Sequence, residues 1–107
     1  MTLEMMKRNK LFNKIKRSLY PIDPGMEIVL FGSRARGDFG NESDWDILIL
    51  TSVNLSKGKK KRIKDAIFDI ELDADEPIST LIYSKDGWGE LEITPLYQNI
   101  KSEGVRL

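Results

Sequence analysis

The residues of this sequence best suited to chemistry lie in one stretch, GSRARGDFGNESDWD, which runs from Gly32 to Asp46. A glycine directly after an apolar run lets the backbone approach a ligand and tolerates positive φ angles. Ser33 adds a hydroxyl donor, and Arg36 adds a guanidinium that can bind phosphate oxygens in a forked geometry. If a helical turn begins here, its free N–H groups favour an anion as well. The start of the stretch therefore predicts a phosphate-binding loop.

Two carboxylates, Asp44 and Asp46, stand at the other end of the stretch, just before the apolar run DILIL. On an extended chain, residues two positions apart point to the same side, so these carboxylates would lie close together and repel. A divalent cation between them removes that repulsion, and Mg²⁺ favours one or two carboxylates combined with substrate phosphates. A phosphate loop followed by such a pair is typical of phosphoryl transfer.

Each fragment also has an ordinary structural interpretation. Gly-Ser is a common turn, Asp-x-Asp is common as a turn or helix cap, and surface arginines are usually solvated. It is the order of the fragments, placed between two apolar runs, that favours a functional site.

The composition limits which chemistry is available. The chain has no cysteine, which excludes disulfides and thiolate zinc sites, and no histidine, which removes the commonest general base and the imidazole ligands. Catalysis would have to come from carboxylates and from lysine, arginine, serine, threonine or tyrosine. Seventeen basic residues balance seventeen acidic ones, which argues against a dedicated nucleic-acid-binding protein.

We expect a single domain over residues 1–107, because a chain of this length forms one modest core. The N-terminal MTLEMMKRNK lacks the apolar segment of a signal peptide. No apolar run approaches the length of about 20 residues that spans a membrane. We therefore expect a cytoplasmic protein that does not enter membranes.

The periodicity of the apolar residues predicts an α-β-β-α-β-α order of elements. Helices are expected over residues 3–19, about 57–72 and about 95–103, and strands over 26–31, 46–50 and 78–83. Residues 86–90 are expected to form a loop or one helical turn, and the last three residues are too short for a prediction. This pattern predicts an α/β domain with a small mixed sheet of three or four strands packed against helices.

The same stretch resembles the motif of a known family. Read as G-S-x-x-R-G followed by S-D-x-D, it is similar to the signature of the minimal nucleotidyltransferases in the polymerase β-like superfamily. The short length and the order of elements fit that group, and the tail TPLYQNIKSEGVRL looks like the ending of short bacterial members. The resemblance implies the polymerase β-like nucleotidyltransferase fold.

The resemblance also implies a reaction. Asp44 and Asp46 would be the catalytic residues and would bind two Mg²⁺ ions together with a nucleoside triphosphate, with ATP favoured. An acceptor oxygen would attack the α-phosphate, so that a nucleoside monophosphate is transferred and pyrophosphate leaves.

The nucleotide-binding residues implied by the resemblance are Gly32, Ser33, Arg36 and Ser43. Gly32 and Ser33 would hold the β- and γ-phosphates, and Arg36 would sit near them. Arg34 also could reach a phosphate oxygen, but it falls at a variable position of the motif, so the resemblance supports this contact less strongly for Arg34 than for Arg36.

The sequence departs from the family pattern at one position. Active members carry a third carboxylate on a later strand, and the matching strand, residues 77–84, has none. Ser79 stands near that position. Asp73, Asp75 and Glu76 lie just upstream, and one of them would reach the site if the strand began a few residues away from its predicted start, although a solvated turn is favoured. General-base catalysis is typically worth about 10²–10⁴-fold, so transfer without this carboxylate would be weakened or lost.

Two functions therefore stay open. The first is an enzyme, and short members of the family commonly act as antitoxins that modify a hydroxyl of a HEPN-type toxin. The second is a binding module of the same fold that neutralises such a partner by contact. A third, nucleic-acid binding through the basic run of residues 57–62, is weaker, because that run is expected to be a solvated helix face. Trp45, Trp88 and Tyr97 are expected to pack in or near the core.

Overall fold

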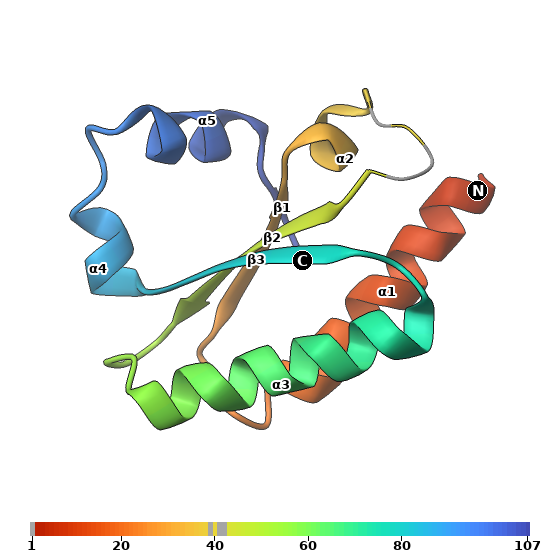
Figure 1. The fold of residues 1–107 in the computed structure, drawn as a ribbon. Helices are drawn as coiled ribbons and strands as arrows, with labels where there is room; N and C mark the ends of the chain where they lie inside the picture. The colour runs from red at the N-terminus through yellow and green to blue at the C-terminus, as the bar shows by residue number, and fades with distance from the viewer. Residues whose placement is uncertain (1, 39, 41–42) are drawn as a thin grey trace.

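The computed structural model describes residues 2–38, 40 and 43–107. Its centre is a four-stranded mixed sheet in the order β3-β2-β1-β4 (Figure 1). The strands are β1 (Glu27–Phe31), β2 (Trp45–Thr51), β3 (Ile78–Ser84) and β4 (Val105–Arg106). The β1 strand pairs antiparallel with both β2 and β4, whereas β2 and β3 run parallel. The predicted small mixed sheet is therefore confirmed.

Helices cover both faces of this sheet (Figure 1). On one face lie the two long helices, α1 (Leu3–Leu19) and α3 (Lys57–Ala74). The other face carries α4 (Lys85–Gly89) and α5 (Pro95–Glu103), and the single turn α2 (Ser33–Arg36) follows the end of β1. Side-chain hydroxyls of Thr2, Ser56 and Thr94 cap the starts of α1, α3 and α5 by accepting backbone N–H bonds.

The apolar run of β2 supplies two separate cores. Ile47 and Ile49 point toward α1 and α3 and are fully buried in the larger cluster. Leu48 and Leu50, which alternate with them, point the other way and pack with Trp88 and Ile100. This is why the strand shows a continuous apolar run in the sequence, as expected for a strand covered on both faces.

The observed elements follow the predicted ones closely. The three expected helices and three expected strands all form, with ends shifted by at most two residues. The segment at residues 85–89 is one short helix, and the chain end adds a two-residue strand beside β1. Within the described residues, no helix is both long and apolar enough to cross a membrane.

A buried aspartate joins the turn after α1 to the far end of β2. Asp23 is only 4% exposed and accepts hydrogen bonds from the Gly25 N–H, from the Ser52 N–H and hydroxyl, and from Lys59 Nζ at 3.0 Å. Burial alone would raise its pKa, but the Ser52, Lys59 and Gly25 hydrogen bonds together hold the pKa of Asp23 well below its usual value of 3.8.

We predict that Asp23→Ala lowers the free energy of unfolding by about 3 kcal/mol, because it leaves buried donors without their acceptor. Since the folded pKa lies below the unfolded one, this contribution is complete above the ordinary value of 3.8 and is lost as the pH falls below it. Urea unfolding of both proteins should show a difference that shrinks below that pH. Asp69→Ala, at an exposed position of α3, should change stability by less than about 0.5 kcal/mol. A difference for Asp23→Ala that persisted at low pH would contradict this account.

Candidate functional site

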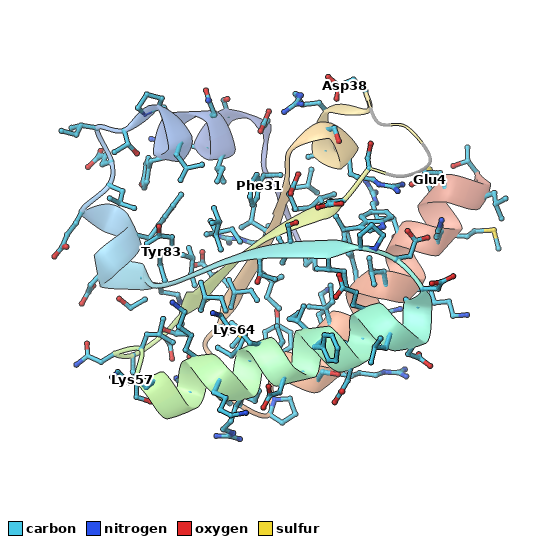
Figure 2. All side chains as sticks on the ribbon, in the orientation of Figure 1. Glu4, Phe31, Asp38, Lys57, Lys64 and Tyr83 are labelled. Carbon is cyan, nitrogen blue, oxygen red and sulfur yellow. The ribbon has the colours of Figure 1, made fainter. Side chains whose placement is uncertain are left out.

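The site begins where β1 ends. Phe31 is the last residue of β1 and lies opposite Asp46 in the antiparallel pair, so the next residue, Gly32, meets the Asp46 side chain. Gly32 has a φ of +75°, and a Cβ added to it would lie 2.2 Å from Asp46 Oδ2. Two features therefore require glycine at this position: its positive φ, and the lack of room for a Cβ beside Asp46. In Figure 2 this turn lies between the labelled Phe31 and Asp38.

The two predicted carboxylates lie on the same face of the sheet as α4 and α5. Asp46 alternates with the inward-facing Trp45 and Ile47, and its side chain is half-buried, whereas Asp44 is exposed. Burial first, and then the charge of nearby Asp44, raise the pKa of Asp46, while Arg36 opposes that shift. The expectation that the pair lies close together and repels is confirmed.

Ser79 occupies the position at which the third carboxylate was expected. It lies opposite Asp46 in the parallel pairing of β2 and β3, and its hydroxyl donates to Asp44 Oδ2 at 2.6 Å. The group on β3 that faces the aspartate pair is thus a hydroxyl and not a carboxylate.

The acidic residues upstream of β3 lie elsewhere. Glu76 accepts a hydrogen bond from Trp45 Nε1 at 3.3 Å and forms an ion pair with Lys7, on the opposite face of the sheet from Asp46. Asp73 pairs with Lys14 of α1. The packing role expected for Trp45 is confirmed, since its side chain is 1% exposed.

The two arginines of the loop, Arg34 and Arg36, make different contacts. Arg34 is buried, with its guanidinium 4.3 Å from the centroid of the Trp45 ring. It donates from Nε and Nη2 to the Ser43 carbonyl and from Nη1 to Glu4, which is labelled in Figure 2 at the start of α1. Arg34 thereby ties the loop before β2 to the core.

Ser43 also has a structural contact in this loop. Its hydroxyl accepts a hydrogen bond from the Gly40 N–H at 2.8 Å. Its assignment to the nucleotide stays a prediction. Ser33, the first residue of α2, is half-buried beside Gly32.

Arg36 is exposed and faces the site, and it contacts Glu103, a residue that no motif in the sequence singles out. Its Nη1 donates to Glu103 Oε2 at 3.1 Å and its Nε donates to Asp38 Oδ2 at 3.2 Å. The other oxygen of Glu103 accepts from the Gly32 N–H at 3.3 Å. Glu103 is 71 residues away in the sequence from Gly32, and its only sequence signal is its place at the end of a predicted helix.

The donor set fits a divalent cation that also binds a phosphate-bearing ligand. Burial and the charge of Asp44 disfavour the ionised form of Asp46, an effect that a bound cation would offset. Such a cation needs only one or two protein carboxylates when phosphates complete its shell. Among the described residues, no three acidic side chains form a group that could hold a metal by themselves. The arrangement therefore suits a metal that arrives with its phosphate ligand.

Comparison with known proteins agrees with this geometry. A family model described as "Nucleotidyltransferase domain" matches residues 10–106. A protein of Methanocaldococcus jannaschii with the provisional name protein adenylyltransferase is 41% identical over 58 residues, which are 54% of this chain and 59% of the relative. The match thus spans less than two thirds of that relative's length.

Solved structures share the fold. A crystal structure of a toxin-antitoxin with AMP-PNP aligns with a TM-score of 0.61 at 23% identity, over 88% of this chain and 69% of the other. A point mutant of the toxin-antitoxin MntA-HpeT aligns with a TM-score of 0.60 at 21% identity, over 94% and 70% of the two chains.

We predict that Gly32→Ala disrupts the site, because the new Cβ would displace the Asp46 carboxylate in addition to its backbone strain. Gly37→Ala is the matched control, since Gly37 has a φ of +87° but no atom within 4 Å of an added Cβ. Positive φ costs a non-glycine residue about 1–2 kcal/mol, so thermal unfolding should show this loss for Gly37→Ala and a larger one for Gly32→Ala. Equal losses would contradict the close approach of Asp46.

Proposed function

Because the chain belongs to the nucleotidyltransferase domain family, we propose that it is a minimal nucleotidyltransferase, which transfers a nucleoside monophosphate from a nucleoside triphosphate to a hydroxyl acceptor with Mg²⁺ as the metal. One observation carries the proposal. The Asp46 carboxylate lies against the Gly32 turn, so the proposed metal ligands and the proposed phosphate donors share one edge of the sheet.

The position of each residue in the site suggests its role in the proposed reaction. Asp44 and Asp46 would hold the metal, which when bound neutralises the charge of the triphosphate. On the β1 side of this pair, the Gly32 N–H, the Ser33 hydroxyl and Arg36 would bind and orient the phosphates. On the β3 side lies the Ser79 hydroxyl, where the acceptor would approach. Positioning of this kind supplies most of the catalysis in phosphoryl transfer.

For the nucleotide and the partner, we propose ATP and a toxin protein of the HEPN type. The structural neighbours are toxin-antitoxin proteins, one of them with AMP-PNP, an analogue of ATP. The M. jannaschii relative is named for adenylyl transfer to protein.

A second candidate function rests on Ser79. A hydroxyl bonded to Asp44 stands where active relatives are expected to have a carboxylate, and no histidine can replace it. The same fold could then act as an antitoxin by contact, with a nucleotide bound but transferred slowly.

We predict that MgATP stabilises the protein and that the double variant Asp44→Asn/Asp46→Asn abolishes this effect, because the variant lacks the charges that hold the metal. At about 100 times its dissociation constant, a ligand adds about 2.7 kcal/mol of stability, which raises the melting temperature of a small domain by several degrees. Thermal unfolding with each of the four nucleoside triphosphates, with and without Mg²⁺, measures this shift.

The control is Asp65→Asn/Asp69→Asn, which makes the same charge change at exposed positions of α3 and should keep the shift. If the Asp44/Asp46 variant keeps the shift in melting temperature, the nucleotide binds at another site. If that variant still neutralises the partner toxin at full strength, the contact mechanism is favoured over transfer.

We predict that Ser79→Asp increases transfer, because it places a carboxylate opposite Asp46 where the family pattern has one. The increase should lie within the range of about 10²–10⁴-fold typical of general-base catalysis, measured as pyrophosphate release from MgATP. Thr80→Asp, one position along β3 and therefore on the other face of the sheet, should give no increase. Equal rates for wild type and Ser79→Asp would show that this carboxylate does not limit the reaction.

A further inference from the structure

The last residue of α5, Glu103, makes two contacts with the groups assigned to phosphate. Its Oε1 accepts from the Gly32 N–H at 3.3 Å, and its Oε2 accepts from Arg36 Nη1 at 3.1 Å. The carboxylate is largely covered, with 20% of its side chain exposed, whereas the Arg36 side chain is 46% exposed. One carboxylate thus engages a backbone donor and a side-chain donor of the same loop.

The segment after Glu103 fixes it in this place. The Gly104 N–H donates to the Ile100 carbonyl at 2.8 Å, and a Cβ on Gly104 would lie 2.7 Å from Val29 Cγ1 of β1. The β4 strand then pairs with β1, and the Leu107 N–H donates to the Ile28 carbonyl. Glu103 is therefore held over the end of β1 by close packing on both sides of it.

Glu103 brings a third carboxylate close to the aspartate pair. Burial first, then the charge of Asp44 and also that of Glu103 raise the pKa of Asp46. Among the described residues, the Glu103 carboxylate accepts hydrogen bonds from the Gly32 N–H and from Arg36. A phosphate group presents oxygens to the same kinds of donor and would make the same charge-assisted bonds.

We propose that Glu103 is a resident anion of the nucleotide site, which occupies the Gly32 and Arg36 donors and must be displaced by a nucleotide phosphate. The proposal rests on the nucleotide site of the proposed function, and it assigns to Glu103 control over how tightly that site binds. Phosphate entry then exchanges one anion for another at the loop, so the number of charged partners of Arg36 stays the same.

The structure does not support a metal-ligand role for Glu103. Among the described residues, Asp44, Asp46 and Glu103 do not form a metal-holding group of three. Glu103 lies on the β1 side of the aspartate pair, whereas the missing carboxylate belongs on the β3 side at Ser79. It is therefore placed to compete with phosphate and not to assist the acceptor.

The test is the dissociation constant of two probes, MgATP and inorganic tripolyphosphate with Mg²⁺, measured by titration calorimetry for the full chain and for Glu103→Gln. The amide removes the negative charge and leaves one acceptor oxygen in place of two, so it holds the Gly32 and Arg36 donors less strongly. Both probes should therefore bind about tenfold more tightly, which corresponds to about 1.4 kcal/mol. Arg36→Gln, which removes a shared donor, should weaken both probes.

Glu92→Gln is the matched control. It makes the same charge change at an exposed residue three positions before α5, at the opposite end of that helix from Glu103, and should leave both affinities unchanged. Glu103→Asp serves as a second variant. It keeps the charge on a shorter side chain that reaches the donors less well, and it should also tighten binding, by less than Glu103→Gln.

The two probes separate this inference from the proposed function. Unchanged or weaker binding by both Glu103 variants overturns the resident-anion role, even if MgATP binding by the wild type still depends on Asp44 and Asp46. Tighter binding of tripolyphosphate without any binding of ATP would support the role of Glu103 and contradict the nucleotide site. Failure of every variant to bind either probe would overturn both.

Discussion

The site depends on one close approach, that of the Asp46 carboxylate to the backbone of Gly32. Any Cβ at this position would occupy the place of the Asp46 oxygen, and the positive φ of Gly32 turns the chain into α2 directly afterwards. Because β1 and β2 are antiparallel, the end of one strand and the start of the other meet at the same edge. The residues proposed to bind phosphate and the carboxylates are thus neighbours in space, although Gly32 and Asp44 are twelve positions apart in the sequence.

The rest of the fold holds this edge of the sheet, where β1 ends and β2 begins, in place. The two apolar clusters on opposite faces of β2 fix the strand so firmly that its polar start is presented in one orientation. Arg34 then anchors the intervening loop through the Ser43 carbonyl and the Trp45 ring. An arginine that looks in the sequence like a second phosphate ligand is thereby used for structure, which leaves Arg36 as the guanidinium facing the site.

Local signals were sufficient to predict the helices, the first three strands, the aspartate pair and the hydroxyl at Ser79, because periodicity, caps and motif spacing are properties of short segments. The two-residue β4 and the contacts of Glu103 were not predictable, since they depend on a pairing with β1. That pairing brings the chain end back beside a strand from the first third of the sequence, as in the pair Leu30 and Val105. Likewise, nothing near Glu76 in the sequence indicates that Trp45 and Lys7 would bind it away from the site.

The charges around the loop favour binding of a nucleotide over its transfer to an acceptor. A phosphate ligand must meet two carboxylates that repel it unless a cation comes with it, and it must also compete with the carboxylate of Glu103 for its donors. On the acceptor side, the Ser79 hydroxyl already donates a hydrogen bond to Asp44, and a hydroxyl is not a strong base. If the nucleotide enters as its magnesium complex, part of the free energy of binding offsets the displacement of Glu103, which couples nucleotide occupancy to α5 and β4. A partner protein that contacts those elements would then sense whether the site is filled, independently of whether transfer is fast.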